Sequence, residues 1–325
     1  MSYIESFKQY TGSSIANTFF IPIVTGNSAD ELGIKILYNM PVPTIVTQLK
    51  PATNVLQKYV KNGWNGGYSA LKTNTEIPMS RVKAENAYSA SDYFSLIYER
   101  LAANKHLNMD DLSGTELEQA ETEMFREALR EALRETMWLG DTTQSTGLNS
   151  FDGFLKTIND RVVMEDITAV TFAKSELTTP ANIVKFLNRL WEASGDDLKS
   201  LRGEGNLVLF ATSDLCDLYE KYLDECGVSS SYREMVDGRT QLSFHGIPMI
   251  DMRLPKTAYP AGLPQTQLIL TDRRNLVLAL NTQDFPGAEV RMWYNPDEME
   301  NRQRAIFMAG CEVLDNNLIM VGNIQ

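Results

Sequence analysis

The sequence has few of the residues that usually carry out catalysis. Its 325 residues include only two histidines, His106 and His245, and neither has a cysteine or carboxylate at metal-ligand spacing. It contains no GxxxxGK[ST] phosphate loop, no GxGxxG dinucleotide loop and no GxSxG motif. We therefore expect a protein that is not an enzyme and that uses neither a metal nor a cofactor.

Long apolar runs are also missing, and the charge is unbalanced. No apolar stretch approaches the length of a membrane span, and the first residues lack a basic segment followed by an apolar core, so we expect neither a membrane segment nor a signal peptide. The net charge of −12 disfavours attraction to nucleic acid or anionic lipid. Cys216, Cys226 and Cys311 are odd in number and unpatterned, which is typical of buried thiols in a reducing compartment.

The stretch from Ser113 to Gly140 predicts a long helix over 113–139. Ser113 and Glu116 fit a capping box, and we expect Gly140 to be the left-handed residue that follows the helix. Apolar residues recur at helical spacing in two adjacent rows. The first row is Leu117, Ala120, Met124, Ala128 and Ala132; the second is Phe125, Leu129, Leu133 and Met137.

The same helix carries two charged stripes. Arg126, Arg130 and Arg134 form a positive stripe, and Glu123, Glu127, Glu131 and Glu135 form a negative one. We expect ion pairs between residues three apart, from Glu123 to Arg126 and onward. Such a pattern fits a solvated surface stabilised by its own pairs, and it also fits a surface that binds another copy of the chain.

The region before this helix predicts extended structure. Residues 33–59 have an irregular pattern interrupted by prolines, and Trp64 lies within a glycine-rich turn. Residues 68–88 predict a two-stranded ribbon that needs a neighbouring surface for its stability. Within it Arg81, Lys83 and Glu85 alternate, so they share one face of a strand.

The region after the helix predicts separate helices and strands, and therefore an α+β fold. Helices are expected over 180–193 and 213–225, with Ser213 as the cap of the second. Strands are expected at 206–210, 290–294, 305–313 and 318–321, as a bent pair over 241–252, and as a hairpin over 267–281. Asp214, Asp217 and Asp224 lie on the second helix, where an exposed acidic face is the common interpretation and a carboxylate site the alternative.

Four stretches, taken in order, resemble the major capsid proteins of tailed phages of the Hong Kong 97 type. They are EIPMSRVKAE (76–85), the long helix with its flanks (111–140), GIPMI (246–250) and NRQRAIFMAGCEV (301–313). The resemblance implies an N-terminal arm, an extended E-loop ribbon, a long spine helix in a peripheral domain and an inserted axial domain. The implied limits are 1–58 for the arm and lead-in, 59–105 for the E-loop and a short helix, 106–165 for the peripheral domain, 166–285 for the axial domain and 286–325 for returning peripheral strands.

The resemblance also implies a function. Such a chain assembles into hexamers and pentamers of an icosahedral shell around double-stranded DNA, is made in the host cytoplasm and ends in the virion. Implied partners are further copies, a scaffolding protein, a portal, decoration proteins, and DNA held without sequence-specific contacts. Contacts between subunits are then expected at Trp64, Arg81, Lys83, Glu85, Glu123, Arg126, Glu127, Arg130 and Arg134, and near the capsomer axis at Tyr232, Arg233 and Asp237.

Two alternatives remain open from the sequence. An encapsulin-like compartment would share the fold but enclose protein cargo. A cytosolic oligomeric enzyme would need a pocket with convergent polar groups, for which Asp214 is the starting candidate.

Overall fold

The computed structural model describes residues 8–10, 33–38, 44–50, 61, 71–89, 116–227, 235–236, 239–240, 242–260, 262–281 and 289–324. The strands are β1 (Lys8–Tyr10), β2 (Lys35–Tyr38), β3 (Thr44–Lys50), β4 (Leu71–Ile77), β5 (Ser80–Tyr88), β6 (Ala169–Phe172), β7 (Leu207–Ala211), β8 (Met235–Val236), β9 (Arg239–Thr240), β10 (Leu242–Phe244), β11 (Ile247–Asp251), β12 (Gln267–Asp272), β13 (Leu276–Asn281), β14 (Glu289–Asn295), β15 (Glu300–Val313) and β16 (Ile319–Ile324). The α-helices are α4 (Glu116–Leu139), α5 (Phe154–Val163), α6 (Pro180–Ala193), α7 (Asp196–Ser200) and α8 (Ser213–Glu225), and five short 3₁₀ turns are η3 (Lys174–Thr178), η4 (Leu201–Glu204), η6 (Lys256–Ala258), η7 (Arg273–Asn275) and η8 (Asn316–Leu318). The fold is thus mixed α and β, as expected.

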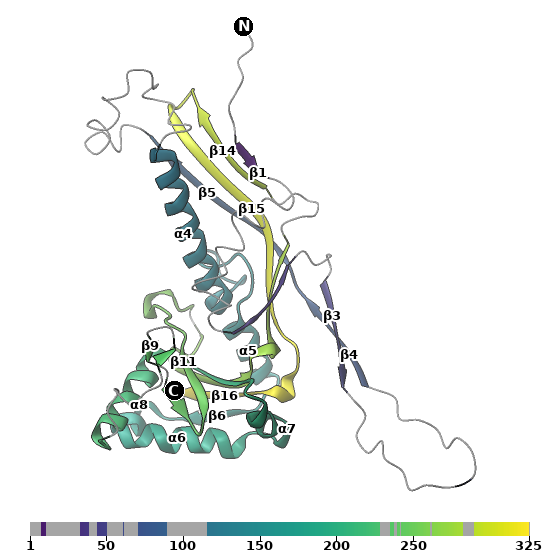
Figure 1. The fold of residues 1–325 in the computed structure, drawn as a ribbon, viewed down its shortest axis with the longest axis vertical. Coiled ribbons are helices and arrows are strands. Elements are labelled where there is room, and N and C mark those ends of the chain that lie inside the picture. Colours follow the sequence, from purple (N-terminus) through teal and green to yellow (C-terminus); the bar gives the residue numbers. More distant parts are fainter. Residues whose placement is uncertain are drawn as a thin grey trace.

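A long sheet is built around β15. Its order is β1-β14-β15-β13-β2, and β5 also pairs with β15. Met308 is opposite both Arg81 of β5 and Asn281 of β13, so these two strands lie on opposite flanks of β15. Arg304 is likewise opposite both β5 and β14. One flank of β15 is therefore covered by β5, and the other by β14 and then β13 (Figure 1).

Helix α4 stands along one face of this sheet (Figure 1). Its second apolar row, Phe125, Leu129, Leu133 and Met137, is buried, as are Ala305, Phe307 and Ala309 of β15 in the same core. The first row is not part of that face, which corrects the expectation: Met124 is 62% exposed, and Ala128 and Ala132 are exposed. Ser113 and the short helix expected after residue 89 lie outside the described residues.

The helix ends at Leu139 as predicted, but Gly140 serves a different purpose. Its φ is not in the left-handed region, contrary to the expectation. A Cβ at this position would lie 2.1 Å from the carbonyl oxygen of Phe151 and 2.6 Å from that of Thr136. Glycine is needed here because two stretches of backbone approach each other closely at the start of the turn into α5.

A second, compact sheet has the order β10-β11-β7-β12-β16-β6, with two parallel pairs, β11–β7 and β16–β6. Helices α6 and α8 pack on one face, in a core that includes Leu209 and Leu270. The opposite face, with Phe210 and Ile269, belongs to the core of α4 and α5. Because both faces are buried, strands such as LVLFA are apolar at every position.

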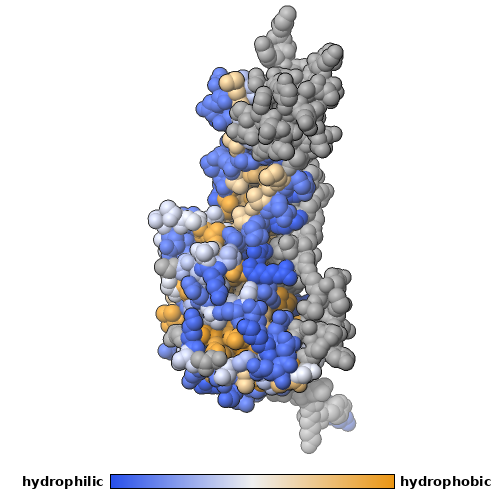
Figure 2. Space-filling model, turned by 90° about the vertical axis from the view of Figure 1, so that its left-hand side faces the viewer, coloured by the Kyte–Doolittle hydropathy of each residue, from blue (hydrophilic) through white to orange (hydrophobic). Residues whose placement is uncertain are grey.

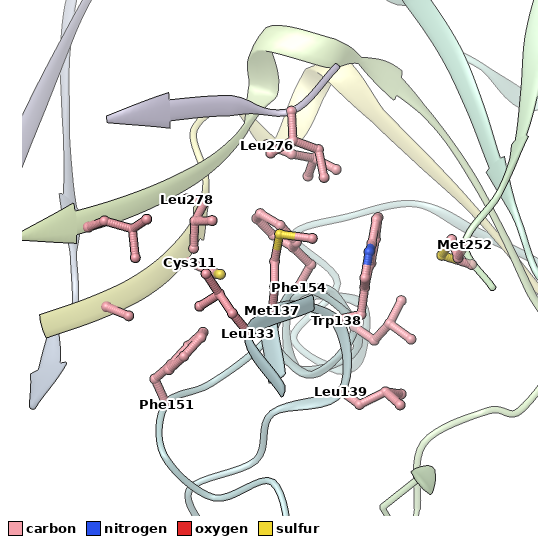
Figure 3. Packing of buried hydrophobic residues seen from close by; sticks show 14 of the residues in the cluster. Leu133, Met137, Trp138, Leu139, Phe151, Phe154, Met252, Leu276, Leu278 and Cys311 are labelled. Atoms are coloured by element: carbon pink, nitrogen blue, oxygen red, sulfur yellow. The ribbon is translucent and has the colours of Figure 1, made fainter. Parts of the chain in front are cut away.

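Trp138 lies where the two sheets meet (Figure 3). It is fully buried at the end of α4, and its ring makes edge contacts with Phe154 of α5 at 5.4 Å and Phe210 of β7 at 5.3 Å. Such aromatic pairs add about 1 kcal/mol each beyond the area they bury. One continuous apolar core therefore connects the long sheet, α4, α5 and the compact sheet.

The chain first passes from the long sheet to the compact one through α4 and α5, and after β12 it crosses between the sheets twice more, which corrects the expected hairpin over 267–281. Strand β12 pairs with β7 and β16 in the compact sheet, whereas β13 pairs with β15 and β2 in the long sheet. The second of these two crossings joins β15 to β16. Since β13 lies in the long sheet and β16 in the compact one, the boundary between the two sheets does not coincide with the expected domain limit at 285.

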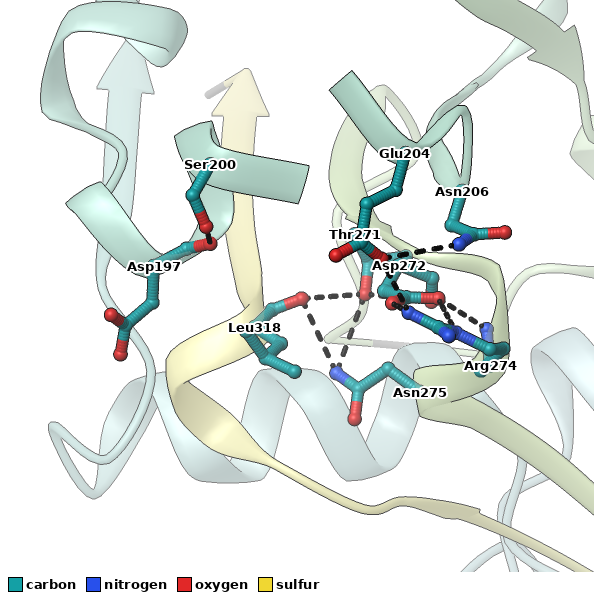
Figure 4. A network of polar contacts seen from close by, with 9 residues as sticks. All are labelled: Asp197, Ser200, Glu204, Asn206, Thr271, Asp272, Arg274, Asn275 and Leu318. Atoms are coloured by element: carbon teal, nitrogen blue, oxygen red, sulfur yellow. Dashed lines mark hydrogen bonds and ion pairs between the residues drawn. The ribbon is translucent and has the colours of Figure 1, made fainter. Parts of the chain in front are cut away.

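Buried Asn275 connects the two crossings (Figure 4). Its side-chain amide donates to the carbonyl oxygen of Asp315 at 2.9 Å and to that of Leu318 at 3.3 Å, and its side-chain oxygen accepts from the Asp315 N–H at 2.8 Å. Next to it, Arg274 and Asp272 form an ion pair at 2.6 Å. These bonds satisfy backbone groups that would otherwise be buried without partners.

The two-stranded ribbon is real, but its strands differ from the prediction. Strand β4 pairs with β3, from the region expected to be irregular, in a register from Thr44–Ile77 to Lys50–Leu71. Strand β5 turns away at Pro78 and joins β15. Figure 1 shows β3 and β4 projecting from the main body. The ribbon therefore needs residues 44–50, which local sequence did not indicate.

Several smaller expectations can be compared with the structure. Pro180 begins α6 as predicted, and Gly227 after α8 is left-handed, with φ of 72°. Thr212, not Ser213, is the residue before α8, because the Ser213 hydroxyl instead donates to Asp251. Cys216 and Cys311 are buried thiols, but Cys226 is exposed. None of the described helices is long and apolar enough to cross a membrane.

Candidate assembly surfaces

The first candidate surface is the outer face of the long sheet, opposite α4. Along β5 the residues at 81, 83, 85 and 87 are exposed and those between them are not. The side chains of Lys83 and Glu85 are 59% and 51% exposed and form an ion pair at 2.8 Å. The predicted alternation of Arg81, Lys83 and Glu85 on one exposed face is thus confirmed.

Strands β15 and β14 add further cations to this face. In β15, Arg302 and Arg304 alternate with residues that pack under α4, so they lie on the outer side. Arg304 is opposite Glu85 and Arg291, and its guanidinium lies over the Trp293 ring at 5.6 Å. The hydrogen bond from Lys83 lowers the pKa of Glu85, and the positive charges of Arg304 and Arg302 lower it further.

The second candidate surface is the outer face of α4. Each expected pair forms: Arg126–Glu123 at 2.7 Å, Arg130–Glu127 at 3.0 Å and Arg134–Glu131 at 2.5 Å. The arginine side chains are only 20%, 21% and 12% exposed, whereas the glutamate side chains are 64%, 62% and 52% exposed. The helix therefore presents carboxylates to solvent, with the guanidinium groups beside them nearer the protein.

Arg134 has an additional structural task. Its Nη1 donates to the carbonyl oxygens of Met252 at 3.1 Å and Arg253 at 2.9 Å, in the segment that follows β11. Arg253 itself has a positive φ of 51°. Arg134 thus attaches α4 to the compact sheet, a role that its place in a surface stripe did not indicate.

The third candidate surface is the ribbon. Ile45 and Leu49 of β3 are 53% and 68% exposed, and both lie on one face because they are four residues apart in a strand. On the opposite face Thr75 donates to the carbonyl oxygen of Leu314 at 3.2 Å, next to a polar pocket of about 460 Å³ between the ribbon, the end of α5 and residues 314–317. The ribbon is thus attached on one side. Its free side carries the exposed apolar Ile45 and Leu49 together with polar Thr47, Lys72, Asn74 and Glu76.

Near this attachment, Arg161 of α5 joins the end of β15. Its guanidinium donates to Glu312 at 2.5 Å, to Asn316 at 2.6 Å and to the Val313 carbonyl oxygen at 2.8 Å. Burial raises the pKa of Glu312, and the charge of Arg161 and the N–H of Val313 partly offset this effect. These bonds hold the ribbon-bearing side of the long sheet to α5.

The structure describes only some of the residues that were expected to contact other subunits. The residues of β5 and α4 lie on two opposite sides of one two-layer unit, while Trp64, Tyr232, Arg233 and Asp237 lie outside the described residues. Sequence reasoning missed Ile45 and Leu49, because apolar and polar residues do not alternate in TIVTQLK and the segment gives no clear strand signal.

The enzyme alternative gains little support from the described residues. Asp214 accepts a hydrogen bond from Thr266 at 2.6 Å, whereas Asp217 and Asp224 are exposed. The polar pocket beside the ribbon is lined by other residues. Among the residues that the structure describes, no group of three or more His, Cys, Asp or Glu side chains could hold a metal ion.

Comparison with known proteins defines the fold. No protein-family model matches the sequence, and no curated protein matches it. A chain of the satellite phage P4 procapsid, which includes the size determination (Sid) protein, is similar in structure, with a TM-score of 0.57 and 12% identity over 96% of this chain and 91% of that one. A chain from Gordonia phage Cozz has a TM-score of 0.54 and 13% identity over 92% and 86% of the two chains. A chain from the capsid of the empty GTA particle has a TM-score of 0.52 and 14% identity over 92% and 90%.

The architecture is therefore one that phage capsid chains share. The likeness extends over nearly the whole chain, so it includes the long sheet, α4 and the compact sheet together. It agrees with the resemblance of the sequence to the Hong Kong 97 type at the level of the capsid fold.

Proposed function

We propose that this chain is the major capsid protein of a tailed phage, a structural subunit without enzymatic turnover. The observation that carries the proposal is the match of almost the entire chain to a procapsid chain, at similar length on both sides. The projecting two-stranded ribbon, with exposed Ile45 and Leu49, supports it, because a ribbon of two strands gains stability from a neighbouring surface.

Within this proposal α4 is the spine helix, the β3–β4 ribbon is the base of the E-loop, and the compact sheet with α6 and α8 is the axial domain. Copies form hexamers and pentamers of an icosahedral shell around double-stranded DNA, assembled in the host cytoplasm. A scaffolding protein, a portal and decoration proteins are the further partners. In this proposal the expected limits of 1–58, 59–105, 106–165, 166–285 and 286–325 are adjusted so that β3 belongs with the E-loop, β5 and β13 with the peripheral domain, and β16 with the axial domain.

Negative-stain electron microscopy with size-exclusion chromatography tests it. The purified chain, alone and co-expressed with neighbouring gene products, is expected to form closed shells, tubes or capsomer rings. Nucleic acid recovered from nuclease-treated shells would separate a genome container from a compartment for protein cargo. A uniform monomer or small oligomer under every condition would contradict the proposal.

A further inference from the structure

The unit formed by α4 and the long sheet has two outer sides of opposite charge. The sheet lies between α4 on one side and the alternate side chains of β5, β14 and β15 on the other. Because strand side chains alternate with a period of two, each residue that is not packed under α4 points away from it. The two outer sides therefore carry separate sets of side chains.

The outer side of the sheet is cationic although the chain carries a net charge of −12. Its described cations are Arg81, Lys83, Arg291, Arg302 and Arg304, and its described carboxylates are Glu85, Glu300 and Glu298, of which the last two pair with Arg302. Half-exposed Ile306 and Met308 lie among them. Glu85 responds to this surplus of positive charge, since Lys83, Arg304 and Arg302 all lower its pKa.

The outer side of α4 has the complementary composition. Glu123, Glu127 and Glu131 are its most exposed charges, while Met124, Ala128 and Ala132 form the apolar row beside them. Figure 2 faces the side of the molecule that carries α4 and shows pale apolar residues bordered by hydrophilic ones. Small alanine side chains leave room for long arginine and lysine side chains to lie along the helix.

The spacings on the two sides are also similar. Residues four apart on a helix are separated by about 6 Å along its axis. Residues two apart on a strand are separated by about 6.7 Å. A row of cations from β5 or β15 can therefore stay in register with the carboxylate row of a helix over two or three residues.

We propose that the outer side of the long sheet of one copy binds the outer side of α4 of a second copy, with Arg81 and Lys83 placed against Glu123 and Glu127. The inference rests on the proposed capsid function and names two of the surfaces that would meet. Such a contact joins two different patches, so it repeats from copy to copy and forms rings or extended arrays. A polyanion such as DNA could neutralise the cationic side chains of the sheet, but it would not bind the acidic side of α4.

Charge reversal on each side provides the test. Arg81→Glu with Lys83→Glu places acid against acid, and Glu123→Lys with Glu127→Lys places base against base. Each double variant is expected to raise the concentration needed for assembly at least tenfold. The reason is that like charges held together at an interface repel each other by several times RT. The quadruple variant is expected to restore assembly, because opposite charges face each other again. An equimolar mixture of the two double variants is expected to restore even-numbered rings such as hexamers, in which the two variants alternate.

Matched controls keep the charge effect separate from a folding defect. Lys185→Glu with Lys221→Glu, and Glu176→Lys with Glu192→Lys, change the net charge equally at exposed positions elsewhere. They are expected to assemble as the parent does. Circular dichroism of every unassembled variant confirms that it folds.

The outcomes separate this inference from the proposed function. A parent chain that never assembles contradicts both. Normal assembly of the double variants, or failure of both the quadruple variant and the mixture to recover, overturns the inference alone. Loss of DNA binding by the sheet variant in a gel-shift assay, with assembly intact, would instead assign the cationic side to a polyanion.

Discussion

The ion pair between Arg161 and Glu312 shows how a single buried residue can depend on its partner. Glu312 is only 8% exposed, and burial raises its pKa, so the folded chain disfavours the charged form. Its contribution to stability therefore decreases as pH rises through the folded-state pKa. Arg161 limits that loss, because its positive charge stabilises the carboxylate.

Arg161→Met is expected to destabilise the unassembled chain by about 3 kcal/mol at pH 8, since it leaves a buried carboxylate without its cation. Without Arg161 the folded-state pKa of Glu312 rises further. The loss of unfolding free energy caused by Arg161→Met therefore becomes smaller as pH falls toward the pKa of an ordinary glutamate. Urea unfolding at pH 8 and pH 5 measures this difference. In the double variant with Glu312→Gln the pH dependence should disappear, and its persistence would contradict the assignment.

Asn275 is a second residue whose role depends entirely on the tertiary structure. Asn275→Ala removes the amide hydrogen bonds to both backbone groups of Asp315 and leaves the Leu318 carbonyl oxygen with the Thr271 hydroxyl alone. We expect a loss of about 3 kcal/mol in the free energy of unfolding. Chemical denaturation measures it, and Asn206→Ala, whose amide makes only a 3.4 Å bond to Glu204, is the control. Equal effects of the two substitutions would argue against a special role for Asn275.

At the scale of the element, Gly140 decides how α4 can be followed by α5. Gly140→Ala is expected to destabilise the chain by more than about 2 kcal/mol, because the new methyl group would overlap the carbonyl oxygen of Phe151. Gly140→Asn should be no better, although asparagine tolerates a left-handed conformation. Thermal unfolding of the unassembled chain measures both.

Gly227 provides the matched comparison, since it is left-handed and has open space around its α-carbon. There, Gly227→Ala should cost about 1 kcal/mol and Gly227→Asn less. If asparagine rescued position 140 as well as position 227, the close approach of backbone would not be the reason for Gly140.

Local sequence signals were sufficient to predict some boundaries of helices and strands. The expected end of α4 and the starts of α6 and β7 agree with the structure, because helix periodicity, proline at the first helical position and short apolar runs are local signals. The hairpin over 267–281 was wrong although both of its strands exist. A tight turn between two apolar strands is equally compatible with a crossing between sheets, and only the buried amide of Asn275 shows which one occurs.

At the scale of the whole molecule, Ile45 and Leu49 are exposed apolar side chains on the free face of the ribbon, which the proposed assembly would bury. Ile45→Ser with Leu49→Ser removes exposed apolar area without affecting the core, so the free energy of unfolding should change by less than about 0.5 kcal/mol. Assembly should weaken at least tenfold, because each buried aliphatic side chain contributes about 1.5–3 kcal/mol.

Sedimentation velocity and electron microscopy measure this effect. Thr47→Ala, on the same exposed face of β3, is the control and should assemble normally. Normal assembly of the Ile45 and Leu49 variant would mean that this face of the ribbon remains in solvent.

The sequence by itself determined the properties that depend on neighbouring residues. These include the end of α4, the ion pairs three residues apart, the exposed alternation on β5 and the mixed α and β class. Each follows from spacing along a single helix or strand. The resemblance to phage capsid proteins also agreed with the fold.

Only the tertiary structure decided which surfaces meet. It placed β4 against β3 and β5 against β15, separated β12 from β13, and buried Phe125 and Leu129 in place of Met124 and Ala128. The physical reason is that the hydrophobic effect is non-directional. An apolar row or an alternating strand must be buried somewhere, but its partner depends on which distant segments together exclude the most water.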